Sequence, residues 1–569
     1  MTRLMLLLGC VLLLALPVHA PATAGTVELD RMARLKLEEF ARRMSAREVR
    51  EAAGVLHELV ATPEMDRLAD TWPFILYNLA CCHSLLGERD QALSFLQQAA
   101  AAGFSDPAQV ERDPDLAGLH DDPGFAHIVQ GLRAEQTRWN SPALRTPYRE
   151  TPGEDEKMAG LARVWSEIKF GSANLDAAPG LDWDSLYVAF IPKVRQAHST
   201  LEYYRLLQQM CARLGDSHTD VDVPPELFLR MYSRPPVDTR FIEGRVIISA
   251  VLDDSLRKQG IRPGLEILKV DGLPVRDHAK SRVAPYVAAS TPQGLAVATY
   301  EFYLLCGPYG QPVTLELADS LNRTLTRTLR RTVTRILSDR RDVEFRILRG
   351  NIGYVALNSF GGSRVSAAFD SLLPAIRRAD ALVLDVRRNT GGNSDVGFNI
   401  LGCLADSAFA IFGWQERVYR PLSRARGLGR RWEGESRAEW PARASQPFRG
   451  PVAVITGPRT GSAAEDFCVA FDVMGRGEIV GAPTAGSTGQ PLNVPLPGGG
   501  SLRVCTLHCT YPDGREYAGV GVEPAVLVHE TVRDLRAGRD IVLETAVGRL
   551  KRRLQGSSRG HRTADGSAP

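Results

Sequence analysis

The chain has 569 residues, of which 44% are hydrophobic and 24% are charged, a composition typical of globular proteins rather than disordered or collagen-like chains. Its 69 basic and 66 acidic residues give a formal net charge of +3, which argues against a nucleic acid or an anionic membrane surface as the main partner. The length exceeds that of one compact domain, so about three or four domains are expected.

The first residues have the features of a secretory signal. Arg3 precedes an apolar run over residues 4–18, and Ala22-Thr-Ala offers a small-residue cleavage site. The apolar run is too short for an ordinary membrane span, and no later stretch approaches about 18 uninterrupted apolar residues. We therefore expect a signal peptide over residues 1–24, no transmembrane segment, and export to the periplasm or, alternatively, to the extracellular space.

Residues 26–140 have the pattern of α-helices. The segment that starts at Trp72 resembles a tetratricopeptide helix pair, because small or packing residues recur where that repeat needs them. These residues are Tyr77, Ala80, Gly87, Ala92 and Ala99. One copy cannot bury both of its faces, so we expect it to pack on flanking helices or on the next domain. Binding of a protein partner and a purely structural role both remain open.

A second helical region is expected over residues 156–232, with Trp165, Trp183, Tyr187 and Ile191 as core candidates. It contains the motif Leu214-Gly-Asp-Ser-His-Thr, after which the apolar pattern changes to the alternation of a strand. This change places a histidine, His218, at a helix-to-strand junction. A polar residue there often serves only a turn, but an imidazole can also act as a base near neutral pH.

Residues 236–335 contain several short strands, and the turn around Asp271-Gly272 joins two of them. This region resembles a PDZ domain, a β domain that binds an extended peptide as an added strand. The stretch 276–310 is longer than a minimal PDZ domain requires. We expect an inserted helix and a lid there.

Residues 340–535 alternate short apolar strands with helices, which predicts an α/β core. Strands are expected at 352–357, 381–386, 452–455, 479–481, 492–496 and 502–510. Residues 551–569 are basic and rich in Gly and Ser, so a disordered tail is expected.

The segment Gly461-Ser-Ala-Ala-Glu lies between an expected buried strand and an expected helix. Ser462 and Glu465 fit a capping box, in which both groups satisfy backbone N–H groups. The same position also suits a nucleophile, because the free N–H groups and the positive dipole end of a helix stabilise an anion formed beside the hydroxyl. The motif alone leaves both interpretations open.

Five ordered features together resemble the serine peptidase family of C-terminal processing peptidases and the tricorn core protease. They are the Leu214 motif, the PDZ-like region, Leu384-Asp-Val-Arg-Arg-Asn-Thr-Gly-Gly-Asn, Gly461-Ser-Ala-Ala-Glu and Gly481-Ala-Pro-Thr-Ala-Gly-Ser-Thr-Gly-Gln. The resemblance covers about residues 156–535. It implies a crotonase-like or ClpP-like α/β core within a multidomain chain, with Ser462 as the nucleophile.

The two branches of this family activate the serine differently. Processing peptidases use a lysine about 25 residues after the nucleophile, but the chain has Ser487 at that position and no lysine between residues 481 and 494. The tricorn-like branch uses a histidine that follows a serine, and Ser217-His218 match that pair. The resemblance thus implies that His218 is the general base and that Ser217 orients it. A supporting glutamate is implied near Gly521-Val-Glu-Pro, where Glu516 is a weak candidate.

The resemblance also places the oxyanion hole at the backbone N–H groups of Gly391, Gly392 and Ala463. A plain tight turn is the alternative at the two glycines. Other polar residues nearby are expected to organise loops or complement the helix dipole: Asp385, Arg387, Asn389, Asp395, Glu465 and Asp466. No metal or organic cofactor is expected, and the cluster Cys505, His508 and Cys509 is interpreted as structural thiols rather than a zinc site.

The leading hypothesis is an exported serine endopeptidase that cleaves polypeptides through an acyl-enzyme, with the PDZ-like domain presenting the substrate. The main alternative is a catalytically inactive protein that keeps the peptidase fold and binds peptides or proteins. A hydrolase of non-peptide esters is a third possibility.

Overall fold

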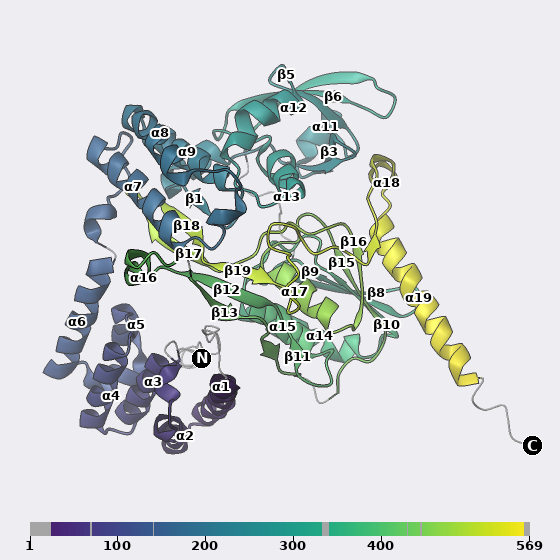
Figure 1. Ribbon diagram of the computed structural model, residues 1–569. Helices are drawn as coiled ribbons and strands as arrows, with labels where there is room; N and C mark the ends of the chain where they lie inside the picture. Colours follow the sequence, from purple (N-terminus) through teal and green to yellow (C-terminus); the bar gives the residue numbers. More distant parts are fainter. Residues whose placement is uncertain are drawn as a thin grey trace, which may run out of the picture. The chain divides into compact units, whose positions relative to one another are not determined.

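The computed structural model describes residues 24–562 except 69–70, 140, 333–340, 430 and 444–445 (Figure 1). The chain forms two compact units, residues 1–145 with 433–435, and residues 146–432 with 436–569. The expected signal peptide lies outside the described residues except for Ala24, where the first helix begins. Within the described residues, no helix combines the length and the apolar character that crossing a membrane requires.

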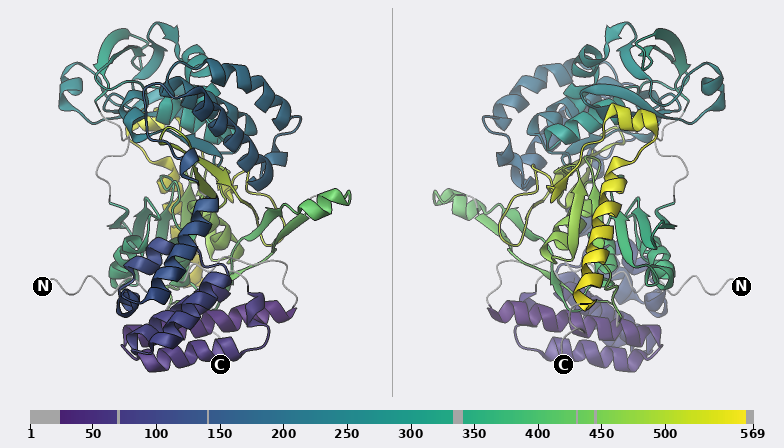
Figure 2. Two further views of the ribbon diagram at one scale, coloured as in Figure 1. Left: turned by 90° about the vertical axis from the view of Figure 1, so that its left-hand side faces the viewer. Right: turned by 90° about the vertical axis from the view of Figure 1, so that its right-hand side faces the viewer.

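The first unit is helical, drawn in purple and blue in Figure 2. Its helices are α1 (Ala24–Ser45), α2 (Val49–Ala61), α3 (Trp72–Leu85), α4 (Arg89–Ala101), α5 (Pro107–Arg112) and α6 (Pro123–Trp139). The expected helix pair is α3 and α4, and Tyr77, Ala80, Ala92 and Ala99 are buried together in one cluster. The helices are therefore confirmed, whereas the tetratricopeptide assignment stays a prediction.

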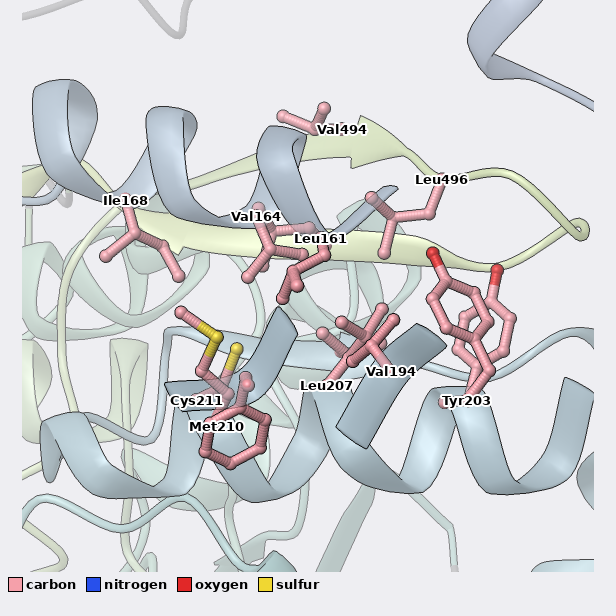
Figure 3. Packing of buried hydrophobic residues seen from close by; sticks show 14 of the residues in the cluster. Leu161, Val164, Ile168, Val194, Tyr203, Leu207, Met210, Cys211, Val494 and Leu496 are labelled. Atoms are coloured by element: carbon pink, nitrogen blue, oxygen red, sulfur yellow. The ribbon is translucent and has the colours of Figure 1, made fainter. Parts of the chain in front are cut away.

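The second unit begins with a helical layer on a small antiparallel sheet. The helices are α7 (Glu154–Gly171), α8 (Trp183–Gln196), α9 (Thr200–Cys211) and α10 (Pro225–Met231). The sheet has the order β1 (Asp220–Asp222), β18 (Ser501–Cys505), β17 (Pro491–Pro495). Figure 3 shows Leu161 and Val164 of α7 and Leu207 of α9 in one apolar cluster with Val494 and Leu496. Of the four core candidates, Trp183 is buried, whereas the other three are only partly buried against this cluster.

A second antiparallel sheet follows, in the order β2 (Val237–Ile242), β3 (Arg245–Val251), β4 (Glu266–Val270), β6 (Pro312–Ala318) and β7 (Thr324–Arg330). The short strand β5 (Leu273–Pro274) pairs with β4. The expected turn between these two strands is confirmed, with positive φ angles of 47° at Asp271 and 80° at Gly272. The stretch before β6 is helical, as expected, and includes α12 (Val275–His278), α13 (Pro292–Ala296) and η8 (Val297–Tyr303). The PDZ assignment itself stays a prediction.

The core of the second unit is a six-stranded sheet in the order β20 (Val526–Leu527), β16 (Gly477–Gly481), β15 (Val452–Thr456), β10 (Ala381–Asp385), β9 (Ile352–Leu357) and β8 (Val343–Leu348). All neighbouring strands are parallel except β8, which runs antiparallel to β9. Every residue of β10 and β15 is buried, as their continuous apolar sequences require. An α/β core is therefore confirmed, while its assignment as crotonase-like or ClpP-like stays a prediction.

Helices pack on this sheet and on one another. Gly397 of α15 (Ser394–Gly402) lies so close to α17 (Ala463–Val473) that a Cβ there would come within 3.3 Å of the Cβ of Phe467. The remaining elements are α11 (Asp254–Lys258), α14 (Ser363–Ile376), β11 (Phe409–Ala410), β12 (Gly413–Val418), α16 (Pro421–Ala425), β13 (Arg431–Glu435), β14 (Glu439–Trp440), β19 (Leu507–Thr510), α18 (Val532–Ala537) and α19 (Ile541–Arg562).

Three expectations from the sequence are corrected. The core does not end at residue 535, because Val542, Ala546 and Leu550 of α19 are buried against the six-stranded sheet. For the same reason the disordered tail expected from residue 551 is wrong up to Arg562, and residues 563–569 lie outside the described residues. The single strand expected over 502–510 is two strands, since β18 pairs with β17 and β1, whereas β19 pairs with β12.

The contact between α7 and α9 provides a test of the packing. A Cβ on Gly160 would lie 1.8 Å from Oη of Tyr203, and that hydroxyl is buried without a hydrogen-bond partner. We predict that Gly160→Ala lowers the free energy of unfolding by about 1–3 kcal/mol through overpacking, although alanine favours a helix.

In the Tyr203→Phe background the overlapping oxygen is absent, so the same change is expected to cost less. Denaturant unfolding of the four proteins, analysed as a double-mutant cycle, measures this coupling. An equal cost in both backgrounds would contradict the described contact.

Candidate active site

Ser462 lies where β15 leads into α17, in a strained backbone conformation. Its φ of 54° and ψ of −132° are unusual for any residue other than glycine. Ser462 and Glu465 have the arrangement of the expected capping box, in which Glu465 accepts from the Ser462 N–H. Oγ of Ser462 lies 3.1 Å from Nε2 of His218. The side chain is therefore directed toward a base, as the nucleophile interpretation requires.

His218 is held at the start of β1 by its neighbours in the Leu214 motif. Its backbone N–H donates to Oδ1 of Asp216 at 3.1 Å, and Thr219 Oγ1 donates to Oδ2 of the same residue at 2.6 Å. The Thr219 hydroxyl in turn accepts from the backbone N–H of Cys505 on β18 at 3.0 Å. Burial lowers the pKa of His218 to about 4, because the charged imidazolium loses its hydration. The imidazole is thus neutral, and able to accept a proton, at neutral pH.

A chain of hydroxyl groups lies behind the imidazole. Nδ1 of His218 is 3.0 Å from Oγ of Ser487, and Ser217 donates to that same Oγ at 2.5 Å. The Ser217 hydroxyl also lies 3.0 Å from Oγ of Ser290. Ser217, which the resemblance implies orients His218, thus reaches the imidazole through Ser487. An oxygen that accepts from Nδ1–H fixes the tautomer in which Nε2 is free to act as a base.

Glu465 ties Ser462 and the Ser487 loop to one carboxylate. Its Oε2 accepts from the backbone N–H groups of Ser462 at 3.1 Å and Ser487 at 2.7 Å. Its Oε1 accepts from the N–H of Gly486 at 2.6 Å and the hydroxyl of Thr484 at 2.5 Å. Burial raises the pKa of Glu465 to about 7 despite these four donors. The structural role expected for Glu465 thus extends to holding the backbones of Ser462 and Ser487, which lie on the two sides of the His218 ring.

The neighbouring carboxylate, Asp466, is also buried and fully engaged. It accepts hydrogen bonds from the hydroxyls of Ser394, Thr488 and Tyr517 at 2.7, 2.7 and 2.8 Å. Burial raises the pKa of this group as well. Asp466 thereby links the first turn of α17 to the start of α15 and to the loop after Ser487.

The three expected oxyanion donors differ in how well they are placed. Gly391 packs against the nucleophile so closely that a Cβ there would lie 2.5 Å from the Cβ of Ser462. Its N–H, however, donates to Oδ1 of Asn389 at 2.9 Å. Ala463 is the first residue of α17, where the N–H has no acceptor within the helix. The N–H of Ala463 is therefore the better candidate, and the role of Gly392 stays a prediction.

Glu516, the weak candidate for the supporting glutamate, contacts His508 rather than Ser217 or His218. Its carboxylate lies 2.9 Å from Nε2 of His508, and its side chain is half exposed. Cys505 and Cys509 are buried free thiols, in line with the structural interpretation. Over the described part of the chain, no group of three or more His, Cys, Asp or Glu side chains is arranged to hold a metal ion.

Ser487 and Glu465 are the functional residues that sequence reasoning missed. The signal for Ser487 was its position, twenty-five residues after Ser462, where processing peptidases carry lysine. The signal for Glu465 was the capping-box spacing, which predicts its bond to the N–H of Ser462. Neither signal predicts that the Glu465 carboxylate binds the loop that carries Ser487.

Comparison with known proteins finds similarity to peptidases. Residues 351–528 match the model of peptidase family S41. The chain is 26% identical over 384 residues to a putative tricorn protease homolog 2 of Streptomyces coelicolor, which covers 65% of this chain and 30% of that protein. It is 22% identical over 308 residues to a carboxy-terminal-processing protease of Bartonella bacilliformis, which covers 52% of this chain and 61% of that protein. The chain thus spans less than two thirds of either relative.

Among solved structures, mature CPAF has a similar fold, with a TM-score of 0.56 and 16% identity over 73% of this chain and 99% of that one. CPAF complexed with lactacystin gives the same TM-score, 0.56, at 15% identity over 71% of this chain and 98% of that one. The matched family region contains the Gly391 loop, Ser462, Glu465 and Ser487. Residues 351–528, which carry most of the candidate site, are therefore similar to peptidase family S41, a family of serine peptidases.

Proposed function

We propose that this protein is an exported serine endopeptidase in which Ser462 attacks the peptide carbonyl and His218 is the general base. The observation that carries the proposal is the 3.1 Å contact between Oγ of Ser462 and Nε2 of His218 at the N-terminus of α17. Substrates would be polypeptides, presented by the domain at residues 236–335, and the site of action would be the periplasm. The helical unit would serve as a surface for a protein partner.

The first half of the reaction forms an acyl-enzyme. As Ser462 Oγ bonds to the carbonyl carbon, its proton moves to Nε2 of His218. The N–H groups of Ala463 and Gly392, together with the positive end of the α17 dipole, stabilise the oxyanion. His218 then gives the proton to the leaving amine, and the peptide bond breaks.

The second half hydrolyses the acyl-enzyme. A water oxygen bonds to the acyl carbon while His218 takes a proton from the water. As the second oxyanion collapses, the bond to Ser462 Oγ breaks and His218 returns the proton to that oxygen. Throughout, Ser487 accepts from Nδ1–H of His218, so the ring keeps its orientation while Nε2 gains and loses the proton. A hydroxyl stabilises the imidazolium less than a carboxylate would. This fits a site in which burial already favours the neutral ring.

The proposal is tested by covalent labelling with a fluorophosphonate probe, which reacts only with an activated serine. Ser462→Ala is expected to abolish labelling, and His218→Ala to slow it by about 10²–10⁴-fold, the usual contribution of a general base. Ser487→Ala should slow it by about tenfold, because one hydrogen bond to the base is lost.

Ser371→Ala provides the matched control, since that exposed hydroxyl bonds only to the backbone O of Ala368. Its labelling rate should equal that of the unmodified protein. Failure of folded protein to label would contradict the proposal and favour a peptidase fold that only binds peptides. Labelling without peptide cleavage, but with ester cleavage, would favour an ester hydrolase.

The lowered pKa of His218 makes a second prediction. Only the neutral imidazole accepts a proton, and burial brings its pKa down from 6.5 to about 4. The labelling rate constant should therefore stay level as the pH falls through 6.5, and decline only as the pH approaches about 4. Quenching the labelling reaction at timed intervals at each pH measures this rate constant, and circular dichroism confirms that the protein remains folded. A decline centred near 6.5 in folded protein would contradict the described burial.

A further inference from the structure

A cavity of about 160 Å³ lies beside the catalytic residues. One wall comes from the helical segment inserted before β6 and includes Ala289, Val297, Ala298 and Phe302. The opposite wall comes from the loops after β10 and β15 and includes Thr390 and Gly461. The cavity is therefore formed jointly by the insertion and the peptidase core.

The cavity is lined by residues that neighbour Ser462 and His218, although these two residues are not part of its lining. Gly461 directly precedes the nucleophile, and Thr390 directly precedes Gly391, which contacts the Ser462 side chain. The hydroxyls of Ser487 and Ser217, behind His218, also line the cavity. A peptide whose carbonyl carbon reached Ser462 Oγ would thus have a neighbouring side chain at this opening.

The lining favours an uncharged occupant. The Ser217 hydroxyl already donates to Ser487, and the Ser487 hydroxyl already contacts Nδ1 of His218. Arg459 contributes a guanidinium to the lining, but its Nε donates to Oε2 of Glu301 at 2.5 Å, and its Nη2 donates to the backbone O of Thr239 at 3.2 Å. A charged side chain would therefore lose its hydration without gaining a counter-ion, which is costly.

The volume limits the size of the occupant. An apolar cavity of about 150 Å³ in another protein holds one benzene molecule. We propose that this cavity binds an apolar side chain of about the size of leucine, on the residue that supplies the scissile carbonyl, and that the inserted segment thereby determines substrate preference. This inference rests on the proposed function, because it assigns a substrate class to the same site.

The test uses diphenyl α-aminoalkylphosphonates, which phosphonylate an active serine while presenting a chosen side chain on the acyl side. With the full chain, the leucine analogue is expected to label Ser462 at least about tenfold faster than the glycine, aspartate and lysine analogues, since a few buried methylenes contribute that much. Equal rates for the four probes would overturn the inference.

Substitutions test whether the preference for the leucine analogue depends on this cavity. Ala298→Phe fills the space, so the advantage of the leucine over the glycine analogue should fall at least about tenfold. Ala296→Phe is the matched control on the same helical segment, because Ala296 does not line the cavity. An unchanged preference in the Ala298 variant, or an equal loss in the Ala296 variant, would overturn the assignment.

A fluorophosphonate without a side chain separates the possible failures. If it does not label the unmodified protein, the proposed function fails. If it labels normally while the phosphonates do not discriminate, only the cavity assignment fails. Ala289→Leu fills the cavity from another position. If the Ala298 variant no longer reacts with the fluorophosphonate, the advantage of the leucine over the glycine analogue is measured in the Ala289 variant, and an unchanged advantage there would overturn the assignment.

Discussion

The site depends on one buried carboxylate. Glu465, in the first turn of α17, accepts four hydrogen bonds, from the N–H groups of Ser462, Gly486 and Ser487 and from the Thr484 hydroxyl. A carboxylate in the interior is costly unless donors and a favourable dipole compensate, and this position supplies both. The same group binds Ser462 and Ser487, which lie on the two sides of the His218 ring, and the Ser462 N–H also donates to the backbone O of Ser487 at 2.5 Å.

The six-stranded sheet fixes where the Gly391 loop and Ser462 lie. Strands β10 and β15 are parallel neighbours, so the Gly391 loop and Ser462 emerge at the same edge, where α/β proteins form their sites. The close approach requires glycine at 391, and Ser462 adopts a positive φ of 54°. Such strain persists only where surrounding contacts over-determine it, as the carboxylate of Glu465 does here. His218 reaches this edge because β1 pairs with β18.

Local motifs predicted the parts of the site that depend on neighbours in the chain. Ser462 follows a buried strand and opens a helix, and His218 marks a change from helical to strand pattern. The contact of Ser487 with His218 joins residues 269 positions apart and depends on how two sheets pack, which no local pattern encodes. The α/β core was predictable from its apolar strands. The continuation of α19 past residue 551 was not, because burial of Val542 and Leu550 overrides a basic, Gly- and Ser-containing sequence.

The most direct test of the account is a crystal structure of the protein after reaction with diisopropyl fluorophosphate. The account predicts phosphorus bonded to Oγ of Ser462, a phosphoryl oxygen within hydrogen-bond distance of the N–H groups of Ala463 and Gly392, and Nδ1 of His218 still in contact with Ser487. An adduct on another serine, or a His218 ring turned away from both serines, would contradict it.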